Sequence, residues 1–217
     1  MLKLAEGSRL LFMGDSVTDM GRARPVAEGL FNPHGTGYPN VVHGLLAALY
    51  PERHIHVINM GCSGNTARDL LARWQTDCLD LKPDWVSVMI GINDVWRQFD
   101  SPHMPASHVL PAEYEAALTE MIRRTKPVVK GMVLMTPYYI EDNPADAMRA
   151  RMDEYGAICK KLAKKHKLIF VDTQAAFNEV LKHYHSSYFA WDRVHPNIPG
   201  ANVLARAFLN GIGFEWK

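Results

Sequence analysis

Asp192 and His195 stand three positions apart in AWDRVHPNIPG, residues 190 to 200, near the end of this 217-residue chain. Taken alone, such a pair is typical of an exposed ion pair in a loop, which contributes little to stability. An imidazole oriented by a carboxylate is also the base that activates a hydroxyl nucleophile in acyl transfer. The choice between these two interpretations depends on whether a nucleophile lies elsewhere in the chain.

Three other polar stretches each follow an apolar run directly. They are GDS (residues 14 to 16), GCSGNT (61 to 66) and GIND (91 to 94). Taken alone, Ser16 is more typical of a helix N-cap than of a nucleophile. In a parallel sheet, however, the carboxyl ends of the strands meet at one edge, and ligands bind there. We therefore expect the three stretches to lie close together.

Together these residues fill every role in a serine-dependent acyl transfer. Ser16 would attack an acyl carbonyl, His195 would take its proton and deliver it to the leaving alcohol, and Asp192 would hold the imidazole in the correct tautomer. The backbone N–H groups of Ser16 and Gly64 and the side-chain amide of Asn93 would form an oxyanion hole. A glycine suits a turn at which the backbone must approach the substrate closely.

Two carboxyl groups in the same stretches have structural explanations. Asp15 is expected to hold the turn before Ser16 by accepting hydrogen bonds from nearby N–H groups. Asp94 is expected to cap the helix that follows it. We therefore assign neither of them to the reaction.

Histidine also occurs in two His-x-His pairs, His54/His56 and His183/His185. If the first pair lies in a strand, its side chains share one face, because alternate strand residues do so. No third ligand stands at a recognisable spacing from either pair. Serine-based acyl transfer needs no metal, so we expect neither a metal nor another cofactor.

The pattern along the chain indicates how these residues are brought together. Five short apolar runs predict strands at 9–14, 54–60, 85–91, 131–137 and 168–172. Amphipathic stretches predict helices at 41–50, 67–74, 111–125 and 145–166, with two more near the end. Strands that are apolar throughout are buried on both faces, so this alternation predicts a parallel five-stranded sheet between two helix layers.

Composition bounds the class of protein. A length of 217 residues suits one domain, and we expect residues 1–217 to form one. With 24 Lys and Arg against 23 Asp and Glu, the net charge of +1 gives no reason to expect nucleic acid as a partner. No apolar run approaches the ~20 residues of a membrane span, so we expect no membrane association.

The start of the chain and the cysteines bear on location. The opening MLKLAEGSRLLFMGDS has no signal-peptide core and no small-residue cleavage site. The three cysteines, Cys62, Cys78 and Cys159, are odd in number and form no CxxC motif. These observations predict a reducing, cytoplasmic location.

In order and spacing, FMGDS, GCSGNT, GIND and DRVHP resemble the four blocks of the SGNH, or GDSL, hydrolases. The family is named for a serine, a glycine, an asparagine and a histidine. The resemblance implies that these are Ser16, Gly64, Asn93 and His195, with Asp192 as the triad acid. It also implies a flavodoxin-like three-layer α/β/α domain, the architecture that the strand pattern predicts independently.

Over almost its whole length the sequence is similar to the intracellular acetyl xylan esterases within that family. The stretches that carry this similarity are GDSVTDMGRARP, GTGYPNVV, SGNTARDLLARW, KPDWVSVMIGINDVWRQ, LMTPYYIE, VDTQAAFNEVL, AWDRVHPN and LARAFL. The resemblance implies an esterase that removes acetyl groups from xylo-oligosaccharides. It also leads us to expect a homo-oligomer.

Two other functions are compatible with the same residues. One is a short-chain carboxylesterase or thioesterase that acts on another acetylated metabolite, and the other is a flavodoxin-like binding module without turnover. Among the aromatic residues, Trp191 and Trp96 could stack on a sugar ring or simply pack. Trp191 adjoins the triad acid, so we expect it near the site, while Trp216 could pack against a neighbouring subunit.

Overall fold

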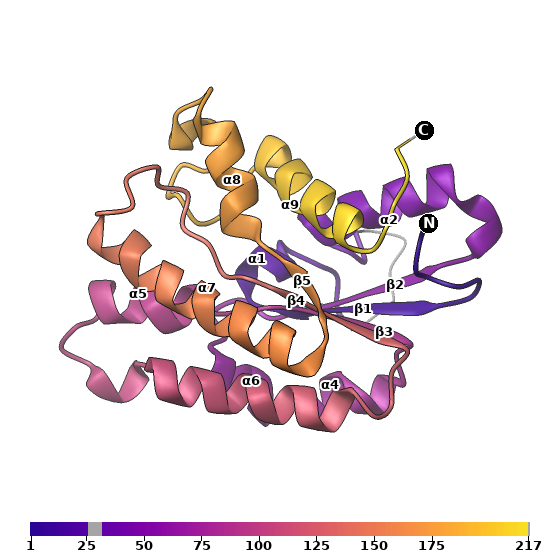
Figure 1. Ribbon diagram of the computed structural model, residues 1–217, viewed down its shortest axis with the longest axis horizontal. Coiled ribbons are helices and arrows are strands. Elements are labelled where there is room, and N and C mark those ends of the chain that lie inside the picture. Colours follow the sequence, from indigo (N-terminus) through magenta and orange to yellow (C-terminus); the bar gives the residue numbers. More distant parts are fainter. Residues whose placement is uncertain (26–31, 217) are drawn as a thin grey trace.

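A five-stranded parallel sheet forms the centre of the molecule (Figure 1). The computed structural model describes residues 1–25 and 32–216. The strands run in the order β2-β1-β3-β4-β5, with bounds β1 (Arg9–Gly14), β2 (His56–Gly61), β3 (Trp85–Met89), β4 (Gly131–Met135) and β5 (Ile169–Val171). The predicted fold class, an α/β/α sandwich around a parallel sheet, is confirmed.

Helices cover both faces of the sheet, with α2, α8 and α9 on one side and α4, α6 and α7 on the other (Figure 1). The α-helices have the bounds α1 (Ser16–Asp19), α2 (Tyr38–Leu49), α3 (Ala67–Ala72), α4 (Trp74–Asp77), α5 (Ile92–Asp100), α6 (Pro111–Thr125), α7 (Ala147–His166), α8 (Thr173–Leu181) and α9 (Ile198–Gly211). Within the described ranges, no helix has the length and apolar character that crossing a membrane would require.

The predicted elements hold, with shifted ends where the backbone turns. β2 begins at His56 rather than at residue 54, because His54 has φ 46° and closes a 3₁₀ turn. β3 ends at Met89 instead of residue 91, because Gly91, with φ 131°, turns the chain into α5. Both differences follow from positive φ angles, which the apolar pattern does not encode.

Several helix ends have the chemistry that the sequence indicates. Thr66 and Asp69 form the capping box at the start of α3, each accepting a backbone N–H of the other. Pro111 occupies the first position of α6, where its missing N–H costs nothing. These ends fix the entry angles of the two helices that pack together on one face of the sheet.

The strand order places two of the polar stretches beside each other. β1 pairs with β2 on one side and with β3 on the other, so the chain changes direction across the sheet between β1 and β3. Ligands of open parallel sheets bind at such a switch point, beyond the carboxyl ends of the strands. Ser16 begins α1 directly after β1, and Asn93 lies in the first turn of α5 after β3.

Candidate active site

Ser16 stands at a tight strand-to-helix turn. Asp15 is the N-cap of α1 and accepts a hydrogen bond from the N–H of Val17 at 3.0 Å, as predicted. Gly14 cannot be replaced without a rearrangement, because a Cβ there would lie 2.2 Å from Oγ1 of Thr18. Burial raises the pKa of Asp15 to about 7, although the hydrogen bond from Val17 acts to lower it. The turn thus holds the serine at the edge of the sheet.

The structure brings Ser16, His195 and Asp192 into one hydrogen-bonded chain. Oγ of Ser16 lies 2.8 Å from Nε2 of His195, and Nδ1 of the same ring lies 2.5 Å from Oδ2 of Asp192. A carboxylate accepts only, so Nδ1 carries the hydrogen and Nε2 is left to accept from the serine hydroxyl. This is the arrangement in which an imidazole can deprotonate the serine.

The loop that carries the acid and the base is held from several sides. Oδ1 of Asp192 accepts the N–H groups of Val194 at 3.0 Å and of His195 at 2.8 Å. Burial alone would raise the pKa of Asp192, but the hydrogen bonds from His195 and Val194 outweigh it and lower the pKa below its ordinary value. The carboxylate therefore stays ionised opposite the imidazole.

Residues after β4 anchor the same loop. The hydroxyl of Tyr138 donates to the carbonyl of Val194 at 2.9 Å, and the N–H of Ile140 donates to the carbonyl of Arg193 at 2.9 Å. Arg193 adopts φ 63° and pairs with Glu141 at 2.5 Å. The left-handed backbone conformation of Arg193, between Asp192 and His195, turns the chain back on itself, so that the Asp192 carboxylate reaches the imidazole of His195.

Three donors are available for an oxyanion. In the part of the chain that the structure describes, neither the N–H of Ser16 nor that of Gly64 donates to a protein acceptor. Gly64 has φ +83° and open space around its α-carbon, so the backbone conformation, not crowding, calls for a glycine. Asn93 is buried and donates one Nδ2 hydrogen to the carbonyl of Asn65 at 2.9 Å, which leaves its second hydrogen free.

The two tryptophans occupy different environments. The ring of Trp96 lies beside His195, with centroids 6.0 Å apart, and the guanidinium of Arg97 sits 5.1 Å from the Trp96 ring centroid. Trp191 is 87% exposed, so its whole face is open to solvent. Trp96 thus forms a wall next to the base, whereas Trp191 is a free aromatic surface beside the triad loop. Trp216 is half-exposed and packs edge-on against Phe214.

A comparison with family models matches residues 12–203 to the GDSL-like lipase/acylhydrolase family. The chain belongs to this GDSL family. The match contains the turn at Ser16, the candidate oxyanion donors Gly64 and Asn93 and the loop with Asp192 and His195, whereas Phe214 and Trp216 lie beyond it. The architecture and the residue types of the site agree with it.

Both a curated protein and solved structures are similar to nearly the whole chain. An acetylxylan esterase of Geobacillus stearothermophilus is 59% identical over 215 residues, which cover 99% of this chain and 98% of the relative. The crystal structure of Axe2, an acetylxylan esterase from the same organism, superposes with a TM-score of 0.97 at 59% identity, covering 99% and 98% of the two chains. The structure of LAE5, an alpha/beta hydrolase from the metagenome of Lake Arreo, gives a TM-score of 0.95 at 53% identity, with 98% of each chain covered.

Variants of Axe2 have also been solved. Three of them are described as catalytic mutants, in which a serine, an aspartate or a histidine is replaced by alanine. These are the three residue types that meet at Ser16, Asp192 and His195 in this GDSL chain.

Asp94 departs from the sequence interpretation. Its carboxylate accepts the N–H of Ala67 at 2.9 and 3.2 Å, so it caps the start of α3 rather than α5, in which it lies. The sequence could not indicate this bond, because its partners are 27 residues apart. Asp94 therefore ties the helix after the GCSGNT stretch to the helix that carries Asn93.

The sequence interpretation also gave no role to Arg73, which anchors the ends of two strands. Its guanidinium donates to the carbonyl of Gly14 at 3.0 Å, to the carbonyl of Met60 at 2.9 Å and to Oδ1 of Asn65 at 2.6 Å. Arg73 lies in the stretch SGNTARDLLARW, but on a helix an arginine is typically a solvated residue. In this GDSL protein it ties the end of β1, next to Ser16, to the end of β2 and the loop that follows it.

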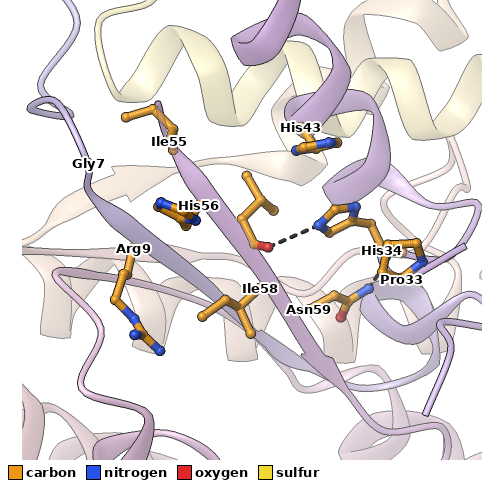
Figure 2. A pocket seen from close by; sticks show the side chains of 10 residues that line it. Gly7, Arg9, Pro33, His34, His43, Ile55, His56, Ile58 and Asn59 are labelled. Carbon is orange, nitrogen blue, oxygen red and sulfur yellow. Dashed lines mark hydrogen bonds between the residues drawn. The ribbon is translucent and has the colours of Figure 1, made fainter. Parts of the chain in front are cut away.

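A pocket of about 480 Å³ lies along the edge strand β2 and not at the triad (Figure 2). There the ring of His34 donates through Nε2 to the carbonyl of Val57 at 3.0 Å and stacks on His43, with centroids 4.2 Å apart. None of the residues that line the pocket belongs to the triad or to the oxyanion hole. Among the described residues, no group of three or more His, Cys, Asp or Glu side chains forms a metal site. The reactive groups, rather than this hollow, locate the active site.

Proposed function

We propose that this protein is a serine esterase that removes O-acetyl groups from acetylated xylo-oligosaccharides through an acetyl-enzyme formed on Ser16. The observation that carries the proposal is the continuous chain from Ser16 through His195 to Asp192, with distances of 2.8 and 2.5 Å. The acetyl and xylan specificity is supported by 59% identity over nearly the full chain to an acetylxylan esterase. Membership of the GDSL family supports the esterase chemistry.

In the first half of the reaction, Oγ of Ser16 attacks the acetyl carbonyl while its proton passes to Nε2 of His195. The carbonyl oxygen becomes an oxyanion, which receives hydrogen bonds from the N–H groups of Ser16 and Gly64 and from Nδ2 of Asn93. Asp192 stabilises the imidazolium that forms, because its carboxylate is already ionised and hydrogen-bonded. The intermediate then collapses, the bond between the acetyl carbon and the sugar oxygen breaks, and His195 protonates that oxygen so that the sugar leaves as an alcohol.

In the second half, His195 deprotonates a water that attacks the acetyl-enzyme. The same donors hold the second oxyanion, and collapse returns the proton to Oγ of Ser16 with release of acetate. Each half-reaction uses the imidazole once as base and once as acid. The chain supplies every group that this cycle requires.

We further propose that Trp96 and Trp191 contact the carbohydrate. Trp96 lies against the catalytic imidazole and would border the acetyl group, and the exposed face of Trp191 would serve as a platform for a xylose ring. A residue that is apolar, aromatic and 87% exposed next to the triad acid supports this role.

The finer predictions on organisation are also proposals: one domain of residues 1–217, a cytoplasmic location and a homo-oligomer. The homo-oligomer is supported by large apolar side chains that remain exposed near the C-terminal elements. They are Tyr184, Tyr188, Ile198 and Trp216.

The test is acetate release from acetylated xylo-oligosaccharides, run beside aryl esters of increasing acyl length. The proposal expects acetate release from the oligosaccharide and a preference for acetyl over longer chains. Ser16→Ala should remain folded and lose several orders of magnitude in turnover, since the members of a triad act as a unit. Preference for long acyl chains would favour a general carboxylesterase, and retained turnover in Ser16→Ala would refute the serine mechanism.

A further inference from the structure

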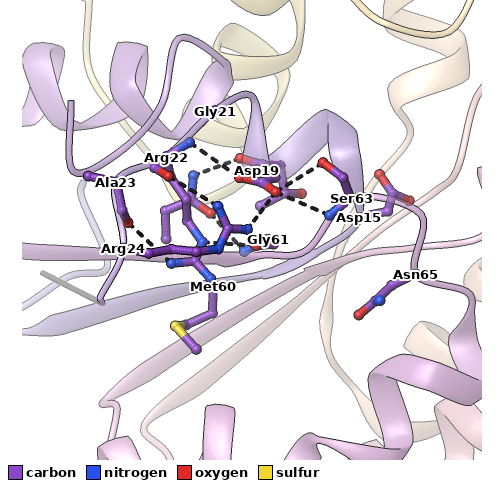
Figure 3. Close-up of polar contacts among 12 residues, drawn as sticks. Asp15, Asp19, Gly21, Arg22, Ala23, Arg24, Met60, Gly61, Ser63 and Asn65 are labelled. Atoms are coloured by element: carbon purple, nitrogen blue, oxygen red, sulfur yellow. Dashed lines mark hydrogen bonds and ion pairs between the residues drawn. The ribbon is translucent and has the colours of Figure 1, made fainter.

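A buried carboxylate lies next to the nucleophile and has no role in the cycle above. Asp19, the last residue of α1, is 3% exposed. Its Oδ2 accepts three hydrogen bonds: from the N–H of Ser63 at 3.1 Å, from the hydroxyl of Ser63 at 3.0 Å and from Nη2 of Arg24 at 2.8 Å (Figure 3). Its Oδ1 accepts the N–H of Arg22 at 3.2 Å. Four donors from two separate segments therefore converge on this one side chain.

The carboxylate is held in its charged form. Burial alone would raise the pKa of Asp19, but the hydrogen bonds from Arg24 and Ser63 outweigh burial and lower the pKa below its ordinary value. A buried charge with this many donors is strongly localised, since moving it away would cost the carboxylate its four donors and break its ion pair with Arg24.

The segment that Asp19 holds is the one that bears an oxyanion donor. Ser63 directly precedes Gly64, so the peptide plane that contains the Gly64 N–H begins at the carbonyl carbon of Ser63. Fixing the N–H and the hydroxyl of Ser63 restricts the rotations that aim this plane. Gly64 itself adopts φ +83°, a conformation that favours glycine.

The contact leaves little room for adjustment. A Cβ on Gly61 would lie 2.2 Å from the N–H nitrogen of Asp19, so the end of β2 packs directly on α1. Arg22 adds a hydrogen bond from Nε to the carbonyl of Gly61 at 2.9 Å (Figure 3). The loop after β2 is therefore fastened to α1 both by backbone packing and by two charged side chains.

One short helix thus connects two parts of the reaction centre. α1 runs from Ser16 to Asp19, so its first residue is the nucleophile and its last residue binds Ser63. The spacing between the N–H of Ser16 and the N–H of Gly64 depends on this connection. An oxyanion hole works only if its donors are in place before charge develops.

We propose that Asp19 is a positioning residue of the oxyanion hole, which holds the Ser63 peptide so that the Gly64 N–H points at the developing oxyanion. The inference rests on the esterase function proposed above. Asp19 would not touch the substrate, so substrate binding in the ground state should be almost unaffected. Its loss should appear in the rate of the chemical step.

The test compares variants of the full chain by steady-state hydrolysis of an aryl acetate. Asp19→Ala should lower kcat by about 10- to 100-fold and leave KM within about threefold of wild type. This loss does not exceed the loss expected when one oxyanion donor is removed completely. Asp19→Asn, which keeps the shape and one acceptor, should fall between Asp19→Ala and wild type. Ser63→Ala removes only the hydroxyl donor and should stay within about threefold of wild-type kcat, because the backbone N–H still binds Asp19.

Asp84 provides the matched control. Like Asp19, it accepts a backbone N–H, that of Arg9 at 2.9 Å, and pairs with a cation, Lys130 at 2.8 Å, but it does so at the opposite end of β1. Asp84→Ala should lower thermal stability without changing kcat. If Asp19→Ala does not accumulate as folded protein, Asp19→Asn carries the same comparison with Asp84→Asn.

A second readout separates positioning from a loss of folded protein. The concentration of folded, reactive enzyme is measured by titrating the active-site serine with a phosphonate and recording how much label is bound at the end point. Inhibition by a small alkyl boronic acid, which forms a tetrahedral adduct with the serine, should weaken in Asp19→Ala by the same factor as kcat, while inhibition by acetate stays unchanged. Wild-type kcat and boronate affinity in folded Asp19 variants would overturn the inference. Activity retained in Ser16→Ala would overturn the esterase proposal instead.

Discussion

Replacing Asp94 with asparagine should change how stability depends on pH. Asp94 is fully buried, and both of its carboxylate oxygens accept the N–H of Ala67. Burial raises its pKa from 3.8 to about 7, against the hydrogen bond from Ala67. The side-chain amide that Asp94→Asn introduces keeps an oxygen for Ala67 but cannot ionise.

The sign follows from the direction of this shift. Below about pH 4 the carboxyl is protonated in both the folded and the unfolded chain, so it does not oppose folding. As the pH rises from about 4 to about 7, the unfolded chain loses this proton while the folded chain retains it, and stability falls. A pKa raised from 3.8 to about 7 corresponds to roughly 4 kcal/mol at 1.36 kcal/mol per pKa unit.

The assay is urea unfolding of wild type and Asp94→Asn between about pH 4 and pH 8. The free energy of unfolding of the variant, relative to that of wild type, should increase by about 4 kcal/mol from the low to the high end of this range. The unpaired amide hydrogens of the variant add a cost that does not depend on pH, so they do not change this difference. Asp84→Asn should show almost no change relative to wild type across this range, because the hydrogen bond from Lys130 lowers the pKa of Asp84 below its ordinary value and this group therefore titrates at lower pH. A difference between Asp94→Asn and wild type that does not vary with pH would refute the reasoning.

Three other substitutions test individual parts of the site. Asn93→Ala removes one oxyanion donor and should lower kcat by about 10²- to 10³-fold, or ~3–4 kcal/mol, with little change in KM; steady-state kinetics that show an effect on KM alone would assign Asn93 to substrate binding. Gly64→Ala places a side chain at φ +83°, so it should lower the unfolding free energy by about 1–2 kcal/mol and slow turnover. If urea unfolding and kcat are both unchanged, position 64 does not require a glycine. Trp191→Ala should raise KM for acetylated xylo-oligosaccharides and leave the kinetics of a small aryl acetate unchanged; equal effects on both substrates would show that Trp191 does not contact the sugar.

The sequence predicts the sheet because its strands are apolar throughout. Leu10, Leu11, Phe12 and Met13 are all fully buried in β1, so one continuous run reports both the strand and its central position. Helix α1 has no such signal, because a four-residue helix is too short to show a period. It was therefore found only in the structure, although it begins at Ser16, the proposed nucleophile.

The candidate site shows the same division. Ser16, Asn93 and His195 could be predicted because each role needs a particular residue type directly after a strand or in a late loop. The roles of Asp19 and Arg73 could not be predicted, since Ser63, which Asp19 holds, is 44 residues away and Gly14, which Arg73 holds, is 59 residues away. In the sequence alone, a charged side chain looks like a solvated one. Burial of a charged group is decided by tertiary contacts, which the local pattern does not contain.

The central claim is that Ser16 carries the acetyl group during turnover. The most direct measurement is rapid chemical quenching of the enzyme with acetylated xylo-oligosaccharide, followed by peptide mass spectrometry. We expect an acetyl group on the peptide that contains Ser16, formed before steady-state acetate release and missing in Ser16→Ala. Acetate release by wild type with no acetylation of Ser16 at any quench time, together with turnover by Ser16→Ala, would contradict the account.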